Sequence, residues 1–511
     1  MSGADRHAYA PAASFDGGDL DCGSGLLLLI RRHIDPLHAG DLLEIRSREA
    51  SVAEDLPAWC RLTGNALVSI VQSGREGSYL VAKGAFVPPV AYVPQRTREP
   101  APLTQPIVAV VVPSDLPAPA PAPAIPPLAV MGVGSWPRPR WLLAALHEHL
   151  EGRLPDHEFA AAADDAVRLA LAAQERAGAD VVTDGEQRRD GYASFVGGRL
   201  DNCQLIPITD LLPYVEDPVA FAAELRALDV PAGKVRHPAV FGALGRSRPL
   251  AAHELVFART VTTRPVKVAL PGPYLLTRTM WMECISDRAY ATREALARDV
   301  VRVLREEIAS LLAGGAALVQ LDEPVLTEVV FGRATGNRTF MCGALGARLD
   351  ADAELAFAES LLCEVVAGFA RERLALHVCR GNWTPDERVA LAGDYGPLVP
   401  LLSAVPVGTL VLELCTGRAG DVEILRALPD DRRIGVGVVN QKSGRVATPD
   451  EIVERAERAI AVFGAQRVLL NPDCGFATFA DSPIASAEIA ERQLAAIASA
   501  ARVLRARHGL G

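Results

Sequence analysis

The stretch that decides how this chain folds reads LALHVCRGN and runs from Leu374 to Asn382. Its apolar beginning predicts a short buried strand. His377 and Cys379 stand two residues apart near its end, so both side chains would leave the same face of that strand. One strand can supply two ligands of one metal ion in this way.

Two further apolar runs reach a potential metal ligand. The run TLVLELC at 409–415 contains Glu413, and the run RVLLNPDCGF at 467–476 contains Cys474. Taken singly, such residues are more often partly buried core residues than ligands. As a set, imidazole, thiolates and one carboxylate suit Zn²⁺, and their spacing is far too long for a zinc finger. The spacing indicates ligands in loops after successive strands of a barrel.

From residue 128 onward the chain repeats a short apolar strand followed by a helix rich in alanine and leucine. Eight strand ends follow this pattern: AVMGVGSW, DVVTDGEQ, VKVALPGP, LVQLDEP, LALHVC, LVLELC, IGVGVVNQK and VLLNPDC. Apolar residues recur at helical spacing in the stretches 287–313, 353–372, 448–463 and 485–507. The alternation predicts an α/β fold, a (βα)₈ TIM barrel over 128–511, with its active site at the carboxyl ends of the strands. The insertion at 190–265 is too long for a loop and is expected to form a helical excursion over the barrel mouth.

A second, smaller unit precedes the barrel. Residues 15–86 read as helix, strand, helix, strand, strand, which predicts a small two-layer α/β sandwich domain. The residues up to about 14 are mostly small or polar and are expected to be disordered. Residues 87–127 are rich in proline and alanine, which predicts a semi-extended linker between the two domains.

Composition narrows the class of protein. The chain has 511 residues, 50% hydrophobic and 22% charged, as expected for a globular protein of two or three domains. Its net charge of −10, with no basic cluster, argues against nucleic acid or an anionic membrane as a partner. Nine cysteines without framework spacing read as reduced thiols. No signal peptide or membrane span is evident, so a cytoplasmic location is expected.

The N-terminal unit resembles the TusA-type sulfur-carrier family over about residues 15–84. The resemblance rests on Cys22 before the first helix, on HAGDLLEI and on DLPAWCRLTGNALV. The family has Cys-Pro-x-Pro at the helix start, where this chain has Gly23 and Gly25 instead of the prolines. A helix N-terminus favours a thiolate, so Cys22 could be a sulfur-carrier thiol. The alternative is a domain kept for docking or stability.

The strand ends resemble the catalytic barrel of cobalamin-independent methionine synthase, in its short, single-barrel form, over about residues 129–508. The motifs that carry the resemblance are Gly134-Ser135-Trp136-Pro137-Arg138, Asp184-Gly185-Glu186, Gly272-Pro273, Gln320-Leu321-Asp322-Glu323-Pro324, His377-Val378-Cys379, Glu413 and Asn471-Pro472-Asp473-Cys474-Gly475. The resemblance implies that zinc is held by His377, Cys379, Glu413 and Cys474. It also implies that homocysteine is bound by Val133, Gly134, Ser135, Glu186 and Asp322.

Physical chemistry agrees with these implied roles. Zinc stabilises a bound thiolate near neutral pH, and a thiolate can attack an electrophilic methyl group. Carboxylates such as Glu186 and Asp322 suit an α-ammonium group, and the backbone near Ser135 could take the α-carboxylate. The alternative for the two acids is a salt bridge across the barrel mouth. That structural reading is the favoured one for Glu323 and Glu328.

The methyl donor is left open by the sequence. Folate-using members of the family carry a histidine proton donor after the seventh strand, and this chain has Lys442 at the corresponding place in GVVNQKSGRV. Trp281 falls slightly later than the family's folate-stacking tryptophan, whereas Glu328 matches a glutamate that contacts folate. Methyltetrahydrofolate and a methyl-corrinoid protein are therefore both candidate donors, with Lys442 as the candidate catalytic acid.

Three functional hypotheses follow. The leading one is zinc-dependent methyl transfer to homocysteine to form methionine. A second is alkyl transfer to or from another thiol or carrier-bound sulfur, with the N-terminal domain as the sulfur carrier. A third is a thiol-binding scaffold attached to a protein-docking module.

Overall fold

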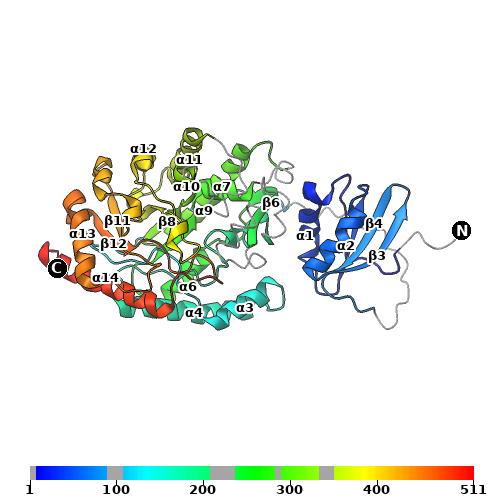
Figure 1. Cartoon of the computed structure of the whole chain (residues 1–511), viewed down its shortest axis with the longest axis horizontal. Coiled ribbons are helices and arrows are strands. Elements are labelled where there is room, and N and C mark those ends of the chain that lie inside the picture. The colour runs from blue at the N-terminus through cyan, green and yellow to red at the C-terminus, as the bar shows by residue number, and fades with distance from the viewer. Residues whose placement is uncertain (1–6, 89–107, 208–235, 282–288, 333–349, 511) are drawn as a thin grey trace.

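The computed structural model of the chain describes residues 7–88, 108–207, 236–281, 289–332 and 350–510 (Figure 1). Part of the predicted linker, residues 89–107, and part of the predicted insertion, residues 208–235, lie outside the described residues. The described residues form two groups of elements: the blue N-terminal elements, and the cyan-to-red elements that follow residue 128.

The N-terminal elements form a four-stranded sheet in the order β1-β2-β4-β3. The sheet is mixed, because β1 runs parallel to β2 while β4 runs antiparallel to both β2 and β3. The elements are β1 (Ala13–Asp16), a π-helical turn (Cys22–Leu26), α1 (Leu27–Ile34), β2 (Leu42–Ser47), α2 (Val52–Thr63), β3 (Ala66–Ser73) and β4 (Glu76–Ala82). The predicted order of helices and strands is present, with one strand added in front.

Strand β1 corrects the prediction that residues up to about 14 are disordered. Ala13 pairs with Leu43 and Phe15 with Ile45, and the Phe15 side chain is buried. The strand has only four residues, too few for a recognisable alternation. Its pairing with β2, about 30 residues away, defines it.

After residue 128 the main feature is a six-stranded parallel sheet in the order β12-β11-β10-β9-β8-β7. Its strands are short, and all their residues except Arg433 are buried, as expected for parallel strands covered on both faces. They are β7 (Lys267–Pro271), β8 (Leu318–Asp322), β9 (Leu374–Val378), β10 (Thr409–Leu412), β11 (Arg433–Val439) and β12 (Val468–Pro472). The last six predicted strand ends therefore coincide with observed strands.

The first two predicted strands make only isolated bridges. Val130 bridges to Leu470 on β12, Met131 to Val181, and Val182 to Val266 just before β7. The segments at 130–131 and 181–182 thus connect the two edge strands of the six-stranded sheet. All three bridges are parallel.

Helices follow the strands and lie outside the sheet (Figure 1). Four of the helical stretches were predicted, and α9 begins six residues later than expected, with residues 282–288 outside the description. The helices are α3 (Arg140–Leu150), α4 (Asp156–Ala177), α6 (Ala252–Val261), α7 (Pro273–Met280), α9 (Arg293–Ala313), α10 (Val325–Phe331), α11 (Ala351–Val366), α12 (Val399–Ala404), α13 (Pro449–Phe463) and α14 (Ala487–Arg507). Thr448 caps α13 through a capping box with Glu451.

The insertion at 190–265 is not a helical excursion in its described part. A 3₁₀ turn (Ser194–Gly198) leads into an antiparallel pair, β5 (Asp201–Pro207) and β6 (Arg236–Gly245), and α6 follows. Strand pairing is a long-range choice here, so helical spacing alone could not reveal it.

The β5–β6 pair also carries the contact with the N-terminal elements, where β6 faces α1 in Figure 1. The Gln204 amide donates to the Arg31 carbonyl and to the Asp35 carboxylate, each at 3.1 Å. Arg32 donates to the Phe241 carbonyl at 3.2 Å and its guanidinium lies over the Phe241 ring. Helix α1 is therefore docked on the insertion through its C-terminal half.

Among the described residues, no helix combines the length and the apolar character that crossing a bilayer requires.

Candidate metal centre and substrate pocket

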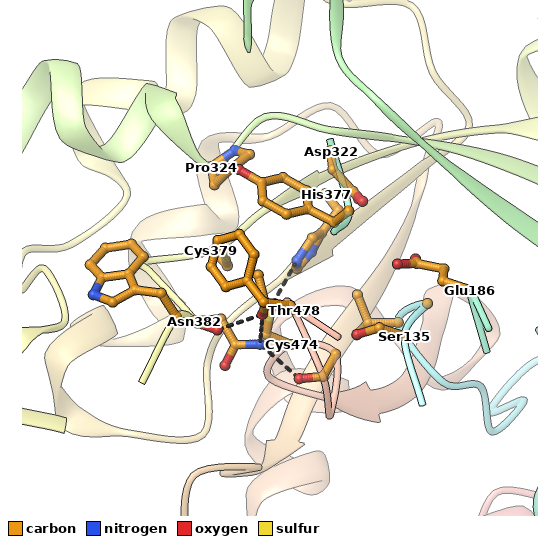
Figure 2. A pocket seen from close by; sticks show the side chains of 15 residues that line it. Ser135, Glu186, Asp322, Pro324, His377, Cys379, Asn382, Cys474 and Thr478 are labelled. Carbon is orange, nitrogen blue, oxygen red and sulfur yellow. Dashed lines mark hydrogen bonds between the residues drawn. The ribbon is translucent and has the colours of Figure 1, made fainter. Parts of the chain in front are cut away.

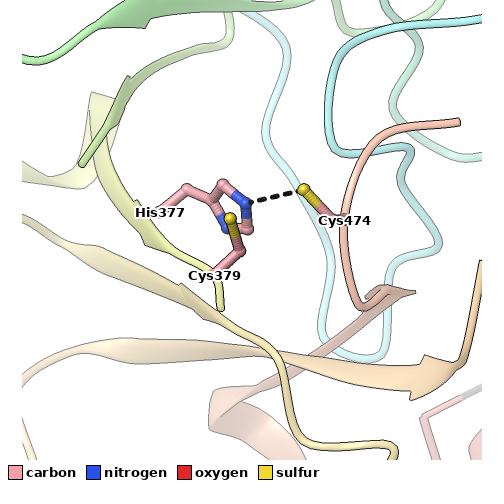
Figure 3. Close-up of side chains that lie close together, drawn as sticks. All are labelled: His377, Cys379 and Cys474. Carbon is pink, nitrogen blue, oxygen red and sulfur yellow. Dashed lines mark hydrogen bonds between the residues drawn. The ribbon is translucent and has the colours of Figure 1, made fainter. Parts of the chain in front are cut away.

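His377, Cys379 and Cys474 form a buried group whose ligand atoms all lie within 4.8 Å of one another (Figure 3). His377 lies on β9, Cys379 directly follows it, and Cys474 follows β12. Strands β10 and β11 stand between β9 and β12 in the sheet. The curvature of the sheet therefore brings together residues from strands that are not neighbours.

A hydrogen bond fixes the imidazole of His377. Its Nδ1 lies 3.0 Å from the carbonyl oxygen of Val411 on β10. A carbonyl only accepts, so Nδ1 carries the proton and donates it. The lone pair of Nε2 is then free to face Cys474, whose Sγ is 3.5 Å away.

The two thiols share protons unequally. A hydrogen bond from the Cys474 thiol lowers the pKa of the Cys379 thiol well below its usual value, and the charge of a protonated His377 acts in the same direction. The same hydrogen bond and burial raise the pKa of Cys474. One sulfur therefore becomes anionic readily and the other keeps its proton, and a bound cation would favour two thiolates.

Glu413 was predicted as the fourth ligand, but it does not belong to this group of three. It directly follows β10 and is buried. Its Oε2 accepts from the Arg380 backbone N–H at 3.0 Å, and its Oε1 accepts a longer bond of 3.4 Å from Arg418. Burial and the nearby Cys379 sulfur raise its pKa. The carboxylate is therefore next to the thiols but turned to these two donors.

A pocket opens beside the group at the carboxyl ends of the strands (Figure 2). It includes the five residues predicted to bind the substrate and three of the four predicted metal ligands. The lining residues are Val133, Gly134, Ser135, Glu186, Tyr192, Asp322, Pro324, His377, Cys379, Asn382, Trp383, Cys474, Gly475, Thr478 and Phe479. One cavity thus joins sulfur and imidazole ligands to two buried carboxylates.

Glu186 is held in an unusual conformation at the edge of this pocket. Its φ is 55°, in the left-handed region that only a few non-glycine residues adopt. Burial raises its pKa to about 7, and the nearby Asp322 acts in the same direction while Arg189 opposes it. A side chain at Gly134 would collide with the Glu186 carboxylate. Glycine at 134 therefore lets the acid reach the pocket.

Asp322 is positioned by its neighbours on the sheet. Its Oδ1 accepts from the Gln320 amide at 2.7 Å, and the same amide donates to the Val133 carbonyl at 3.2 Å. Burial raises the pKa of Asp322. The Lys267 ammonium donates to the Gln320 Oε1 at 2.8 Å. Sequence reasoning assigned no role to Lys267 or Gln320.

Several lining residues were also missed. Asn382 donates to the Gly475 carbonyl at 2.7 Å and to the Thr478 hydroxyl at 2.8 Å, and it accepts from Gln441 at 2.5 Å. It thereby ties the loop after β9 to the loop after β12. Its place three residues after Cys379 was the only sequence signal. Tyr192, Trp383 and Phe479 also line the pocket, but they are far apart in the sequence.

Three residues singled out in the sequence, Lys442, Glu328 and Trp281, lie apart from this pocket's lining. Lys442 is buried after β11, and its Nζ has no hydrogen-bond partner among the described residues. Burial lowers its pKa, while nearby Glu413 and Cys474 raise it. Glu328 lies on α10, 4.0 Å from Arg278. Trp281 directly follows α7 and is partly buried.

Glu323 has a structural role, but it acts as a helix cap and not through the salt bridge that was expected. It is fully buried, and its carboxylate accepts from the backbone N–H groups of Tyr274 at 2.8 Å and Leu275 at 3.0 Å. It therefore caps the first turn of α7.

Cys22 does not have the environment expected of an activated thiol. It is buried at the start of the π-helical turn. Burial raises its pKa to about 12, and Asp55 and Asp21 act in the same direction. The expected helix-dipole effect is outweighed by desolvation and by these carboxylates.

Comparison with known proteins gives the family. The family model described as "Cobalamin-independent synthase, Catalytic domain" matches residues 128–497. The chain belongs to this family. The predicted resemblance of the barrel region is thereby confirmed, and with it the prediction that the chain is an enzyme of the methionine synthase type.

Relatives of this chain include the methionine synthase of Sulfurisphaera tokodaii, 28% identical over 352 residues that cover 69% of this chain and 86% of the relative. The methionine synthase of Saccharolobus solfataricus is 25% identical over 382 residues, covering 75% and 96%. A B12-independent methionine synthase structure from a Shewanella species, in complex with selenomethionine, aligns with a TM-score of 0.55 at 22% identity, covering 75% and 98% of the two chains. This structural likeness concerns the fold.

Proposed function

We propose that this protein transfers a methyl group to the thiol of homocysteine and forms methionine, using a bound zinc ion. The observation that carries the proposal is one cavity that contains His377, Cys379 and Cys474 together with the carboxylates of Glu186 and Asp322. A site that binds a thiol amino acid requires two kinds of group: a metal for the sulfur and an anionic partner for the ammonium group. Family membership supports the same reaction.

The residues present fit zinc. Zinc–sulfur and zinc–nitrogen bonds of about 2.3 and 2.0 Å in tetrahedral geometry place the two ligand atoms about 3.5 Å apart. The Cys474 Sγ and the His377 Nε2 are 3.5 Å apart. We propose Glu413 as the fourth protein ligand, through Oε1, because that oxygen has only the long contact with Arg418 to give up. Zinc bound there would supply a Lewis acid that keeps the substrate sulfur a thiolate near neutral pH.

The amino-acid end of homocysteine would lie at the other side of the pocket. Glu186 and Asp322 are proposed to bind the α-ammonium group, together with the Val133 carbonyl. Ser135, whose Oγ accepts from the Ala477 backbone N–H at 3.2 Å, is proposed to orient the α-carboxylate with its backbone N–H. Both acids have raised pKa values when the pocket holds no cation, and an ammonium group would favour their charged forms.

Lys442 is the proposed catalytic acid. Its buried Nζ lies near the carboxylate and thiols of the metal centre, which act on its pKa. A lysine whose pKa is lowered by burial gives up its proton more easily than an exposed lysine, and the departure of a demethylated donor would require such a proton. Glu328 is proposed to contact the donor from α10.

The proposal also includes predictions about the fold, the role of the N-terminal domain and the cellular location. The parallel sheet with its two bridging segments favours a (βα)₈ barrel over 128–511. We further propose that residues 15–86 are a TusA-like α/β sandwich domain and that residues 87–127 are the linker. The N-terminal domain is proposed to serve in docking, because α1 contacts the β5–β6 pair and the Cys22 thiol is buried. A cytoplasmic location stays a prediction.

The test is an assay of homocysteine methylation by the zinc-loaded protein with methyltetrahydrofolate and a methyl-corrinoid protein in parallel. Methionine formed with either donor supports the proposal and identifies the donor. Failure with both donors, in protein that holds zinc and binds homocysteine, would move the reaction to another alkyl donor. Failure to bind homocysteine at all would overturn the proposed acceptor.

A further inference from the structure

Hydrogen bonds join three buried polar side chains beneath the substrate pocket: Lys267, Gln320 and Asp322. Lys267 and Gln320 do not line the cavity. Lys267 is the first residue of β7, and Gln320 lies two residues before Asp322 on the neighbouring β8. Lys267 is 1% exposed and Gln320 is fully buried. Gln320 and Asp322 alternate with Leu321, so they leave the same face of β8.

The hydrogen bonds among these side chains permit only one orientation of the Gln320 amide. An ammonium group donates and cannot accept, so the amide must turn its oxygen toward Lys267. Its NH₂ group then faces two acceptors, the Asp322 carboxylate at 2.7 Å and the Val133 carbonyl at 3.2 Å. One amide thus joins two segments of the pocket wall that are 189 residues apart in the sequence, Val133 and Asp322.

Charge points to the same role. Lys267 is surrounded by groups that favour its cation: Asp322, Glu186 and the Cys474 sulfur oppose the burial that lowers its pKa to about 7. The Asp322 carboxylate in turn is stabilised by Lys267 and by the Gln320 hydrogen bond. A buried carboxylate without such partners would stay protonated and would be a poor partner for an ammonium group.

We propose that Lys267 and Gln320 are positioning residues for the amino-acid acceptor: Lys267 fixes the Gln320 amide, which holds the Asp322 carboxylate and the Val133 carbonyl at the spacing that receives the α-ammonium group. The inference rests on the proposed function and adds residues to its substrate site. It assigns neither residue a contact with the substrate, because both lie behind the pocket wall.

The test uses the full-length, zinc-loaded chain and measures homocysteine binding by calorimetry beside steady-state kinetics. Lys267→Met keeps the length of the side chain without its donor, and Gln320→Met removes all three hydrogen bonds of the amide. Each is expected to weaken homocysteine binding about 10-fold and to raise KM more than it lowers kcat, with zinc content unchanged. Because Lys267 and Gln320 act through one amide, the double variant should bind homocysteine no more weakly than the single variant with the lower affinity.

Arg433→Met is the matched control. Arg433 is also the first residue of a strand of this sheet, β11, but its guanidinium donates to the Ile125 carbonyl at 3.1 Å, away from the pocket. It should bind homocysteine as the wild type does. If Lys267→Met does not fold, Gln320→Met and its pair with Lys267→Arg carry the test by the same binding measurement.

Two outcomes overturn the inference and one overturns the proposed function instead. Wild-type affinity in Gln320→Met, or additive losses in the double variant, would mean that the two residues do not act through one amide. A wild-type protein that holds zinc but binds no homocysteine would reject the acceptor itself. The two failures are therefore distinguishable in one set of titrations.

Discussion

The Nδ1 atom of His377 donates a hydrogen bond to the carbonyl oxygen of Val411, 3.0 Å away on the adjacent strand. This bond decides which ring nitrogen can bind a metal. It turns Nε2 toward Cys474 and makes a backbone carbonyl the outer partner of the proposed ligand. Strands of the six-stranded sheet and the loops after them thus provide both the proposed ligands and the group that orients one of them.

We expect Cys474→Ser to lose most of its bound zinc, because a hydroxyl is a far weaker ligand than a thiolate. Metal content is measured on the purified protein after dialysis against a mild chelator. Cys415→Ser is the matched control, since Cys415 lies two residues after Glu413 but outside the group of three. Full zinc retention in Cys474→Ser would show that the assigned group is wrong.

Glu413→Gln tests the fourth ligand separately. The amide keeps the shape of the side chain but removes the charge, so zinc affinity should fall by less than in Cys474→Ser and the protein should still bind zinc when it is in excess. Competition with a chromophoric chelator gives the two affinities. Equal zinc affinity in Glu413→Gln and the wild type would mean that Glu413 is not a ligand and that zinc has three protein ligands.

Asp322→Asn is expected to weaken homocysteine binding about 10-fold or more while zinc content stays the same, since the lost partner is an ion pair with the ammonium group. Calorimetric titration with homocysteine measures this directly. Glu323→Gln, at the next position, should instead lower the melting temperature and keep the affinity, because Glu323 caps α7. Equal affinity in Asp322→Asn and the wild type would reject the role of Asp322.

The Glu186 carboxyl should make ligand binding depend on pH. Its pKa is raised from 4.5 to about 7, so below pH 7 it is mostly neutral and attracts an ammonium group less. Affinity for methionine, which has no titratable thiol, should therefore rise between pH 6 and 8, and Glu186→Gln should lose most of this rise. In the absence of ligand, folding stability depends on pH with the opposite sign from ligand affinity. The stability that Glu186 contributes is lost as pH rises from 4.5 through about 7. A pH-independent wild-type affinity would contradict the assignment.

Lys442→Met should lower kcat at least 10-fold with little change in homocysteine affinity, because the proposed role is proton donation and not acceptor binding. Steady-state kinetics with the donor identified above gives the comparison. Arg445→Met is the control on the same loop, since Arg445 is exposed and paired with Glu451. An unchanged kcat in Lys442→Met would remove Lys442 from the catalytic residues.

Cys22→Ser is expected to leave the methylation of free homocysteine intact and to reduce stability by about 1–3 kcal/mol, because a hydroxyl replaces a buried thiol. Mass spectrometry after persulfide trapping should find Cys22 unmodified in the folded protein. Cys60→Ser, in the same domain and also buried, is the matched control. A persulfide on Cys22 would restore the sulfur-carrier hypothesis.

The sequence by itself determined the strand ends from β7 to β12 and the chemistry at them. His377, Cys379, Glu413 and Cys474 could be proposed as ligands because each lies in or after a short apolar run, and the buried strands of a parallel sheet are such runs. Glycine at 134 and the acids at 186 and 322 belonged to motifs that resemble one family, and the match to that family spans all three positions.

The tertiary structure decided which of these residues meet and how. Strand β1 and the β5–β6 pair exist through pairing with distant segments, which no local pattern encodes. The thiol acidity at Cys22 depends on burial that the sequence does not show, and it overrides the expected effect of the helix terminus. The His377 proton is set by the Val411 carbonyl on the next strand, and the Gln320 amide is oriented by Lys267 on β7 and by the Val133 carbonyl. Such partners depend on which groups are neighbours in space.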